Sequence, residues 1–210
     1  MAKTFYLTTA GTMGSGKTTV ANLIAKHLKF HLLLEQFGKN QFLPRFYKNM
    51  PRWAFHSQTF YLMEKITQML ETNKLLKKTS IVQDTVIYQD VMSYAKAQFI
   101  LGNMDEAEFT LYTKIYASFV NRLPKPDLII YLKAPLEILL ARVKQRPQSV
   151  EKNQKVSYLK ILDTLNQEWI KRQPKEKVLF IDAFKYNFVV DGKHINHLID
   201  KIKEKLKTFK

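Results

Sequence analysis

The chain has 210 residues, of which 46% are hydrophobic, with only six glycines and seven prolines. This composition is typical of one globular domain with a sizeable core. The absence of cysteine excludes disulfides and thiolate metal sites. No apolar run approaches the roughly 20 residues of a membrane span, so we expect a cytoplasmic protein without membrane contact.

The formal net charge is +16, and it has two interpretations. One is a nucleic-acid partner, whose phosphates basic side chains would neutralise. The other is a set of solvated basic helix faces around a site for a polyanionic nucleotide. Because lysines are spread along the whole chain, we favour the second interpretation and expect no nucleic-acid partner.

The first predicted strand, at residues 5–9, leads into Gly-Thr-Met-Gly-Ser-Gly-Lys-Thr at 11–18 and then into helical periodicity. This segment fits the phosphate-loop pattern G-x-x-x-x-G-K-[ST], in the strand, loop and helix context that the pattern requires. Backbone N–H groups would point at phosphate oxygens beside the helix N-terminus. Lys17 would reach the β- and γ-phosphates, and the Thr18 hydroxyl would ligate Mg²⁺. The motif predicts a nucleoside triphosphate site formed by Gly11, Thr12, Met13, Gly14, Ser15, Gly16, Lys17, Thr18 and Thr19.

Four further apolar runs predict buried strands, at residues 31–34, 80–83, 128–132 and 178–181. Long helical patterns separate them, which favours an α/β fold: a five-stranded parallel sheet of the P-loop NTPase type, flanked by helices. We expect one domain over residues 1–210 with a helical lid at about 142–155. Ligands of such sheets bind beyond the carboxyl ends of the strands.

Two carboxylates follow predicted strands, Glu35 after the second and Asp84 after the third. Either one alone could be a helix cap or a surface residue. Phosphoryl transfer, however, needs a group that deprotonates or positions the attacking oxygen, and ligands for the metal. Because both carboxylates lie at strand ends in a chain with a phosphate loop, we favour functional roles for them.

Gln58 lies within a dense aromatic segment at residues 42–68, most of which we expect to be core. A half-buried Gln in this setting caps a loop backbone or contacts the edge of a nucleobase, and its position alone favours the cap. Arg142 and Arg146 lie one helical turn apart before Pro147. They would clamp the transferred phosphoryl group or form a solvated basic helix end, and the sequence leaves both open.

Taken together, these residues resemble the deoxynucleoside kinase family, phosphate-loop enzymes that phosphorylate the 5′-hydroxyl of deoxyribonucleosides. The resemblance covers nearly the whole chain. It implies that Glu35 is the catalytic base that takes the proton of the 5′-hydroxyl. In the segment from Phe42 to Gln58, it implies that Tyr47 bonds the sugar 3′-hydroxyl and that Gln58 reads the base.

Further along the chain, the resemblance implies an Mg²⁺-associated role for Asp84. Asp90 falls where members that accept amino-bearing bases carry an aspartate, and Tyr94 matches the ring that stacks on the base. Arg142 and Arg146 match lid arginines, and Glu151 matches the acid that holds the 3′-hydroxyl.

The chain departs from the family pattern at two positions. Thr85 stands where the family has an arginine that orients the catalytic carboxylate and touches the phosphoryl group, and Gln148 replaces one lid arginine. Another cation would have to substitute for the first arginine, and the candidates are Arg45, Lys48 and Lys144.

We therefore expect an ATP-dependent deoxynucleoside 5′-kinase for nucleotide salvage that requires Mg²⁺ as cofactor. Its small-molecule partners would be ATP and a nucleoside, with deoxyadenosine favoured over deoxyguanosine or deoxycytidine, and the family resemblance suggests a homodimer. One alternative is a nucleoside monophosphate kinase such as thymidylate kinase, which needs basic groups for the acceptor's own phosphate. A less favoured alternative is a nucleic-acid-associated ATPase that uses the +16 charge.

Overall fold

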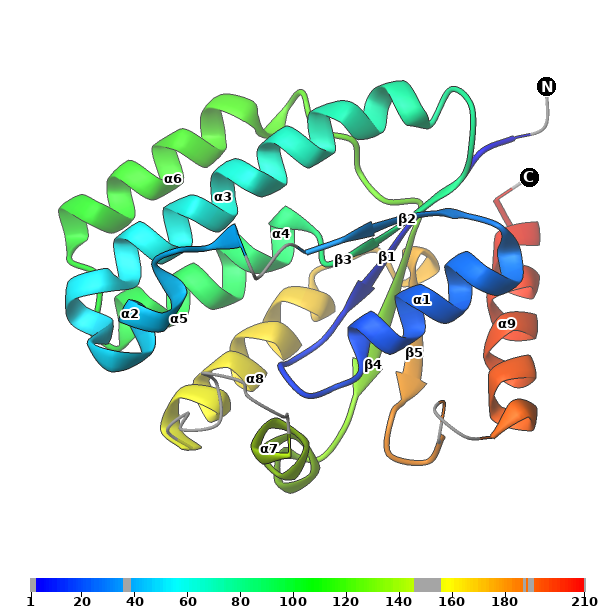
Figure 1. Ribbon diagram of the computed structural model, residues 1–210. Coiled ribbons are helices and arrows are strands. Elements are labelled where there is room, and N and C mark those ends of the chain that lie inside the picture. Colours follow the sequence, from blue (N-terminus) through cyan, green and yellow to red (C-terminus); the bar gives the residue numbers. More distant parts are fainter. Residues whose placement is uncertain (1–2, 36–38, 146–155, 187, 189–190, 210) are drawn as a thin grey trace.

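The computed structural model describes residues 3–35, 39–145, 156–186, 188 and 191–209. Its centre is a parallel five-stranded sheet in the order β2-β3-β1-β4-β5 (Figure 1). The strands are β1 (Tyr6–Ala10), β2 (His31–Leu34), β3 (Ile81–Asp84), β4 (Leu128–Lys133) and β5 (Val178–Asp182). The predicted parallel sheet is confirmed, with strand ends that differ from the predicted ones by at most one residue.

Helices connect the strands and cover both faces of the sheet (Figure 1). They are α1 (Lys17–Leu28), α2 (Leu43–Lys48), α3 (Met50–Leu75), α4 (Ile87–Gln89), the π-helix η2 (Asp90–Ala95), α5 (Lys96–Ile100), α6 (Glu106–Val120), α7 (Leu136–Lys144), α8 (Val156–Lys171), the 3₁₀ helix η4 (Lys175–Lys177) and α9 (Gly192–Lys207).

The three central strands, β3, β1 and β4, are buried on both faces because successive side chains alternate between two cores, whereas the edge strands β2 and β5 are partly exposed. Leu7, Val82 and Ile130 pack with α1, α7 and α9. Tyr6 and Ile129 point to the opposite face and pack with α3, α4, α6 and α8. Continuous apolar runs are therefore the pattern expected of these strands.

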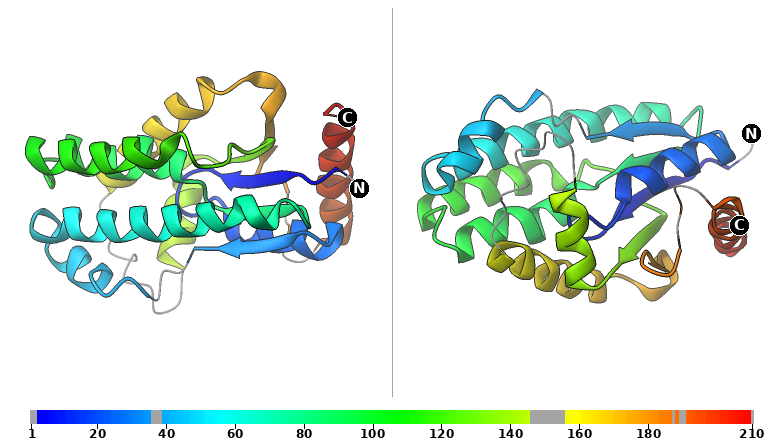
Figure 2. Two further views of the ribbon diagram at one scale, coloured as in Figure 1. Left: turned by 90° about the horizontal axis from the view of Figure 1, so that it is seen from above. Right: turned by 60° about the horizontal axis from the view of Figure 1, so that its bottom comes forward.

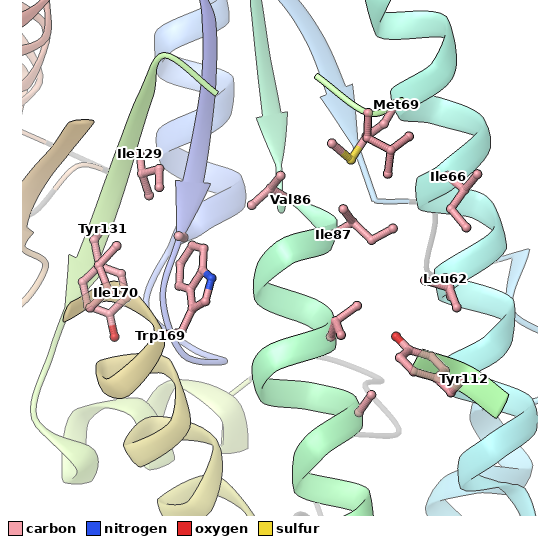
Figure 3. Close-up of a cluster of buried hydrophobic side chains, with 14 of the residues drawn as sticks. Leu62, Ile66, Met69, Val86, Ile87, Tyr112, Ile129, Tyr131, Trp169 and Ile170 are labelled. Atoms are coloured by element: carbon pink, nitrogen blue, oxygen red, sulfur yellow. The ribbon is translucent and has the colours of Figure 1, made fainter. Parts of the chain in front are cut away.

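The second core fills the space between the sheet and the long helices. Figure 3 shows side chains of α3 and α4 facing each other, with Tyr112 of α6 between the helices and Trp169 of α8 against the sheet. Helices α3 and α6 run side by side and project beyond the sheet edge (Figure 2). They begin at side-chain caps, since Asn49 accepts a hydrogen bond from the Arg52 N–H and Asp105 forms a capping box with Glu108.

Helix α9 explains part of the basic charge. Its apolar stripe, which includes Leu198 and Ile202, is buried, while Lys203 and Lys207 are exposed. These lysines lie on a solvated helix face, as the sequence indicated. No helix among the described residues has the length and apolarity that crossing a bilayer would require.

Candidate functional site

The register of the sheet brings three strand ends to one edge. Thr9 of β1 pairs with Asp84 of β3, and Asp84 pairs with Leu34 of β2. The phosphate loop follows β1 directly and Glu35 follows β2, so both lie beside Asp84 at the carboxyl edge of the sheet.

The phosphate loop adopts the left-handed backbone that its glycines permit. Gly14 has φ 85° and Gly16, which precedes α1, has φ 96°. A Cβ on Gly14 would lie only 2.7 Å from the carbonyl oxygen of Leu139 in α7, so the loop packs directly on that helix. Helix α1 begins at Lys17, and its N-terminus is suited to binding an anion.

A buried polar network holds the start of the loop. The Gln89 side chain accepts from the Gly11 N–H at 3.3 Å and donates to the Gly11 carbonyl at 2.9 Å. It also donates to Asn166 Oδ1 at 2.8 Å, and Asn166 in turn donates to the Thr12 hydroxyl at 3.2 Å. That hydroxyl donates to Asp163 at 2.8 Å. The loop is therefore fixed to α4 and α8, and sequence reasoning did not identify Gln89, Asn166 or Asp163.

Asp84 is buried, and each of its carboxylate oxygens accepts a hydrogen bond from a threonine hydroxyl. Its Oδ2 accepts from the Thr18 hydroxyl at 2.5 Å, and its Oδ1 accepts from the Thr9 hydroxyl at 3.2 Å. A hydroxyl and a carboxylate in contact beside a phosphate loop are hard oxygen donors of the kind Mg²⁺ prefers. Thr18 and Asp84 therefore fit the metal role predicted for them.

A cavity of about 330 Å³ opens beside the loop. Its lining includes most of the predicted donor and acceptor residues, from the loop, β2, β3, α2, α3 and η2. The lining residues are Met13, Gly16, Lys17, Thr18, Thr19, Glu35, Leu43, Phe46, Tyr47, Gln58, Tyr61, Asp84, Thr85, Asp90, Tyr94 and Tyr158. Gly11, Thr12, Gly14 and Ser15 belong to the loop but do not line this cavity.

The residues predicted to contact a base come from two elements that contact each other, α3 and η2. Gln58 is buried on α3, and Asp90 and Tyr94 lie on the π-helix η2. A π-helical turn inserted between α-helical segments is frequent at functional sites. Gln58 lines the cavity, as the prediction of a base contact requires.

Only one of the predicted lid residues lies within the described part of the chain, and it is not at the cavity. Arg142 lies in the last turn of α7, and its Nη2 donates to the carbonyl of Ala183 at 2.9 Å. It does not line the cavity. Arg146, Gln148 and Glu151, together with most of the expected lid, lie outside the described residues.

The candidates for the missing cation also lie elsewhere. The guanidinium of Arg45 lies 5.0 Å from the centre of the Trp53 ring, and Lys48 and Lys144 are exposed. None of the three lines the cavity. The geometry therefore does not support the expectation that one of them substitutes for the family arginine, whose position is occupied by Thr85 in this chain.

A buried charge cluster that sequence reasoning missed lies behind the cavity. The Nζ of Lys65, on α3, is 3.3 Å from Glu35 Oε1 and 3.6 Å from Asp90 Oδ2. It donates to the Thr85 carbonyl at 2.6 Å and to the Thr85 hydroxyl at 2.9 Å. The sequence signal was a lysine within the apolar stripe of Leu62 and Ile66, seven residues after Gln58 and so on the same helix face.

Burial raises the pKa of Glu35 to about 7. The ammonium of Lys65 opposes this rise, as does that of Lys17 more weakly, while Asp90 and Asp84 add to it. A carboxylate with a pKa near neutrality is suited to take a proton at physiological pH.

Comparison with known proteins agrees with this geometry. A family model described as deoxynucleoside kinase matches residues 7–207. The deoxyadenosine/deoxycytidine kinase of Bacillus subtilis (strain 168) is 32% identical over 212 residues, which cover 95% of this chain and 92% of that protein. The deoxyguanosine kinase of the same organism is 30% identical over 204 residues, which cover 95% and 96%.

A solved structure is also similar. The deoxyadenosine kinase from M. mycoides with bound dCTP has a TM-score of 0.79 and 25% sequence identity, covering 97% of this chain and 99% of that one. The sheet, the loop and the helices of this chain therefore follow an arrangement already known in nucleotide-binding kinases.

Gln89→Leu should lower both stability and nucleotide affinity. The variant leaves the buried N–H and carbonyl of Gly11 without their side-chain partner, which costs about 1–3 kcal/mol for a group left unpaired. Urea unfolding should show this loss, and a fluorescent triphosphate analogue should bind more weakly. Gln173→Leu, two residues after α8, loses only a hydrogen bond to the Trp169 carbonyl and should leave triphosphate affinity unchanged. Equal losses of affinity in both variants would contradict a specific role for Gln89.

Proposed function

Because the chain belongs to the deoxynucleoside kinase family, it is an enzyme that phosphorylates deoxyribonucleosides, and we propose that deoxyadenosine is its preferred acceptor. Deoxyguanosine and deoxycytidine would be weaker acceptors, and the reaction would serve nucleotide salvage. Family membership favours this function over a monophosphate kinase or a nucleic-acid-associated ATPase.

The observation that carries the proposal is the shared cavity. Lys17 and Thr18 of the phosphate loop line this cavity. Gln58, Asp90 and Tyr94 line it too and would contribute the groups for a base. Gln58 offers a donor and an acceptor side by side, and Tyr94 offers an aromatic face for stacking. Asp90 Oδ2 lies 3.6 Å from Lys65, longer than a hydrogen bond, so it can accept from an exocyclic amino group.

The sugar would be bound through its 3′-hydroxyl. Tyr47 lines the cavity and is proposed to bond this hydroxyl together with Glu151. Close contacts on the 3′ side would leave little room for a 2′-hydroxyl, which would explain a preference for deoxyribose. This part of the proposal rests on the resemblance, since Glu151 is not among the described residues.

In the proposed mechanism Glu35 takes the proton of the 5′-hydroxyl as that oxygen attacks the γ-phosphate of ATP. Lys17 and the N–H groups of the loop hold the β- and γ-phosphates. Thr18 and Asp84 would hold Mg²⁺, which neutralises charge on the phosphates when it is bound. Arg142 and Arg146 would close over the γ-phosphate, and for Arg142 this requires release of its hydrogen bond to Ala183.

An acceptor panel tests the substrate. Purified enzyme with labelled ATP and Mg²⁺ should phosphorylate deoxyadenosine with the highest kcat/KM among the four common deoxynucleosides, and more efficiently than adenosine. Deoxyadenosine monophosphate should not be an acceptor. A preference for the monophosphate, or for thymidine, would contradict the assignment of Gln58 and Asp90.

Glu35→Gln should lower kcat by about 10²-fold or more, the usual contribution of a general base, with triphosphate binding unchanged. Because Glu35 acts only when deprotonated and burial raises its pKa to about 7, kcat/KM should fall about tenfold per pH unit below pH 7 in the wild type. Glu106→Gln, an exposed carboxylate on α6, serves as the control. Unchanged turnover in Glu35→Gln would remove Glu35 from the mechanism.

We also propose a homodimer formed through α3 and α6. Met63 and Leu70 on α3 and Leu111 on α6 are large apolar side chains that are 48%, 37% and 49% exposed. The two helices lie side by side, so these residues can form one apolar surface (Figure 2). Light scattering should give a dimer mass for the wild type and a monomer mass for Leu111→Asp, and a wild-type monomer would contradict the proposal.

A further inference from the structure

Lys65 is a buried cation with a complete set of oxygen partners. Its exposed fraction is 2%, and its ammonium contacts the Thr85 carbonyl, the Thr85 hydroxyl and the carboxylates of Glu35 and Asp90. An ammonium has three donors, and all three find acceptors in this shell. A buried charge is tolerated in a fold only with such compensation.

The ammonium stays charged in this position. Burial alone would lower the pKa of Lys65, but the carboxylates of Glu35, Asp90 and Asp84 raise it above its ordinary value. The cluster therefore holds a fixed positive charge beside the carboxylate proposed as the base.

Lys65 reaches that carboxylate from outside the cavity in which the substrates are proposed to bind. It does not line the cavity beside the phosphate loop. It lines a second cavity of about 320 Å³ between β2 and α3, and Glu35 and Tyr61 line both cavities. An effect of Lys65 on kcat would therefore pass through Glu35 and would not require contact with a phosphate, whereas an effect through Asp90 would appear in the KM for the acceptor.

We propose that Lys65 is the positioning residue for Glu35 and takes the place of the cation missing at Thr85. It holds the Glu35 carboxylate in one orientation and favours its anionic form, and it is itself fixed by two hydrogen bonds to Thr85. The inference rests on the proposed role of Glu35 as base.

The charged groups around Glu35 determine how its pKa should change when Lys65 is removed. They are the ammonium groups of Lys65 and Lys17 and the carboxylates of Asp90 and Asp84. Among the described groups that change the pKa of Glu35, removing Lys65 leaves two carboxylates and the weaker of the two cations. Lys39, Glu64 and Glu71 also line the second cavity with Glu35 and are the same in both enzymes. The pKa of Glu35 should then rise above its wild-type value, and the acid limb of the kcat/KM profile should move to higher pH.

Lys65→Met tests this with the deoxynucleoside that the wild type phosphorylates best. We expect kcat to fall about 10²-fold at pH 7, the cost of a misplaced catalytic group, with triphosphate affinity retained. The acid limb should move upward, so that high pH restores part of kcat/KM. Lys74→Met, an exposed lysine on the same helix, should behave as wild type. A folded Lys65→Met enzyme whose acid limb is unchanged would overturn the proposal.

A double-mutant comparison covers the case in which Lys65→Met alone fails to fold. Adding Lys65→Met to Glu35→Gln should lower the residual kcat at saturating acceptor by no more than about twofold, the ordinary error of additivity, because Lys65 would act on kcat through Glu35. Loss of its contact with Asp90 would change the KM for the acceptor instead. This double variant also removes both charges of the buried pair, so the penalty of an unpaired charge is smaller. A further large fall in turnover would show a role independent of Glu35 and overturn the proposal.

Thr85→Arg in the Lys65→Met background asks whether a cation is what Glu35 needs. The Thr85 hydroxyl lies 2.9 Å from the Lys65 ammonium, so a longer side chain at this position can reach the vacated space. Recovery of kcat and return of the acid limb toward pH 7 would support the proposal, and no recovery in a folded enzyme would overturn it. Unchanged turnover in Glu35→Gln would instead remove the base itself, so the two failures are distinguishable.

Discussion

The alignment of three neighbouring strand ends is the constraint on which the site depends. Leu34, Asp84 and Thr9 lie in register, so whatever follows β2 and β1 must meet the end of β3. Parallel strands can align in this way because each connecting helix returns the chain to the amino edge of the sheet, so that every strand ends at the carboxyl edge. The phosphate loop, a carboxylate from β2 and a carboxylate from β3 thus come together through backbone hydrogen bonding, before any side chain selects a ligand.

The second constraint is electrostatic, and it explains why this edge needs a lysine from α3. Glu35, Asp84 and Asp90 place three carboxylates around one cavity, and burial makes each negative charge costly. Thr9 and Thr18 stabilise Asp84 with hydrogen bonds, whereas Lys65 forms ion pairs with Glu35 and Asp90. The buried ammonium therefore lets a carboxylate with a pKa near 7 remain beside another acid.

The sequence was sufficient for the sheet and for most of the cavity, because both follow from local patterns. Apolar runs marked the strands, and the spacing of the glycines and Lys17 marked the loop. Lys65 could not be assigned in the same way, since its partners are about 20 to 30 residues away in the chain and only the packing of α3 on the sheet brings them together. Arg142 was placed by its helix position and by its match to a lid arginine of the family, neither of which decides between a ligand and a nearby carbonyl.

Gln89 lies directly before the π-helix that carries Asp90 and Tyr94, and its side chain also grips Gly11. The part of the enzyme that would recognise the base and the part that would hold the phosphates are consequently joined by a single amide. A displacement of the π-helix would therefore strain the hydrogen bonds that hold the start of the loop, which would couple selectivity for the acceptor to affinity for the donor.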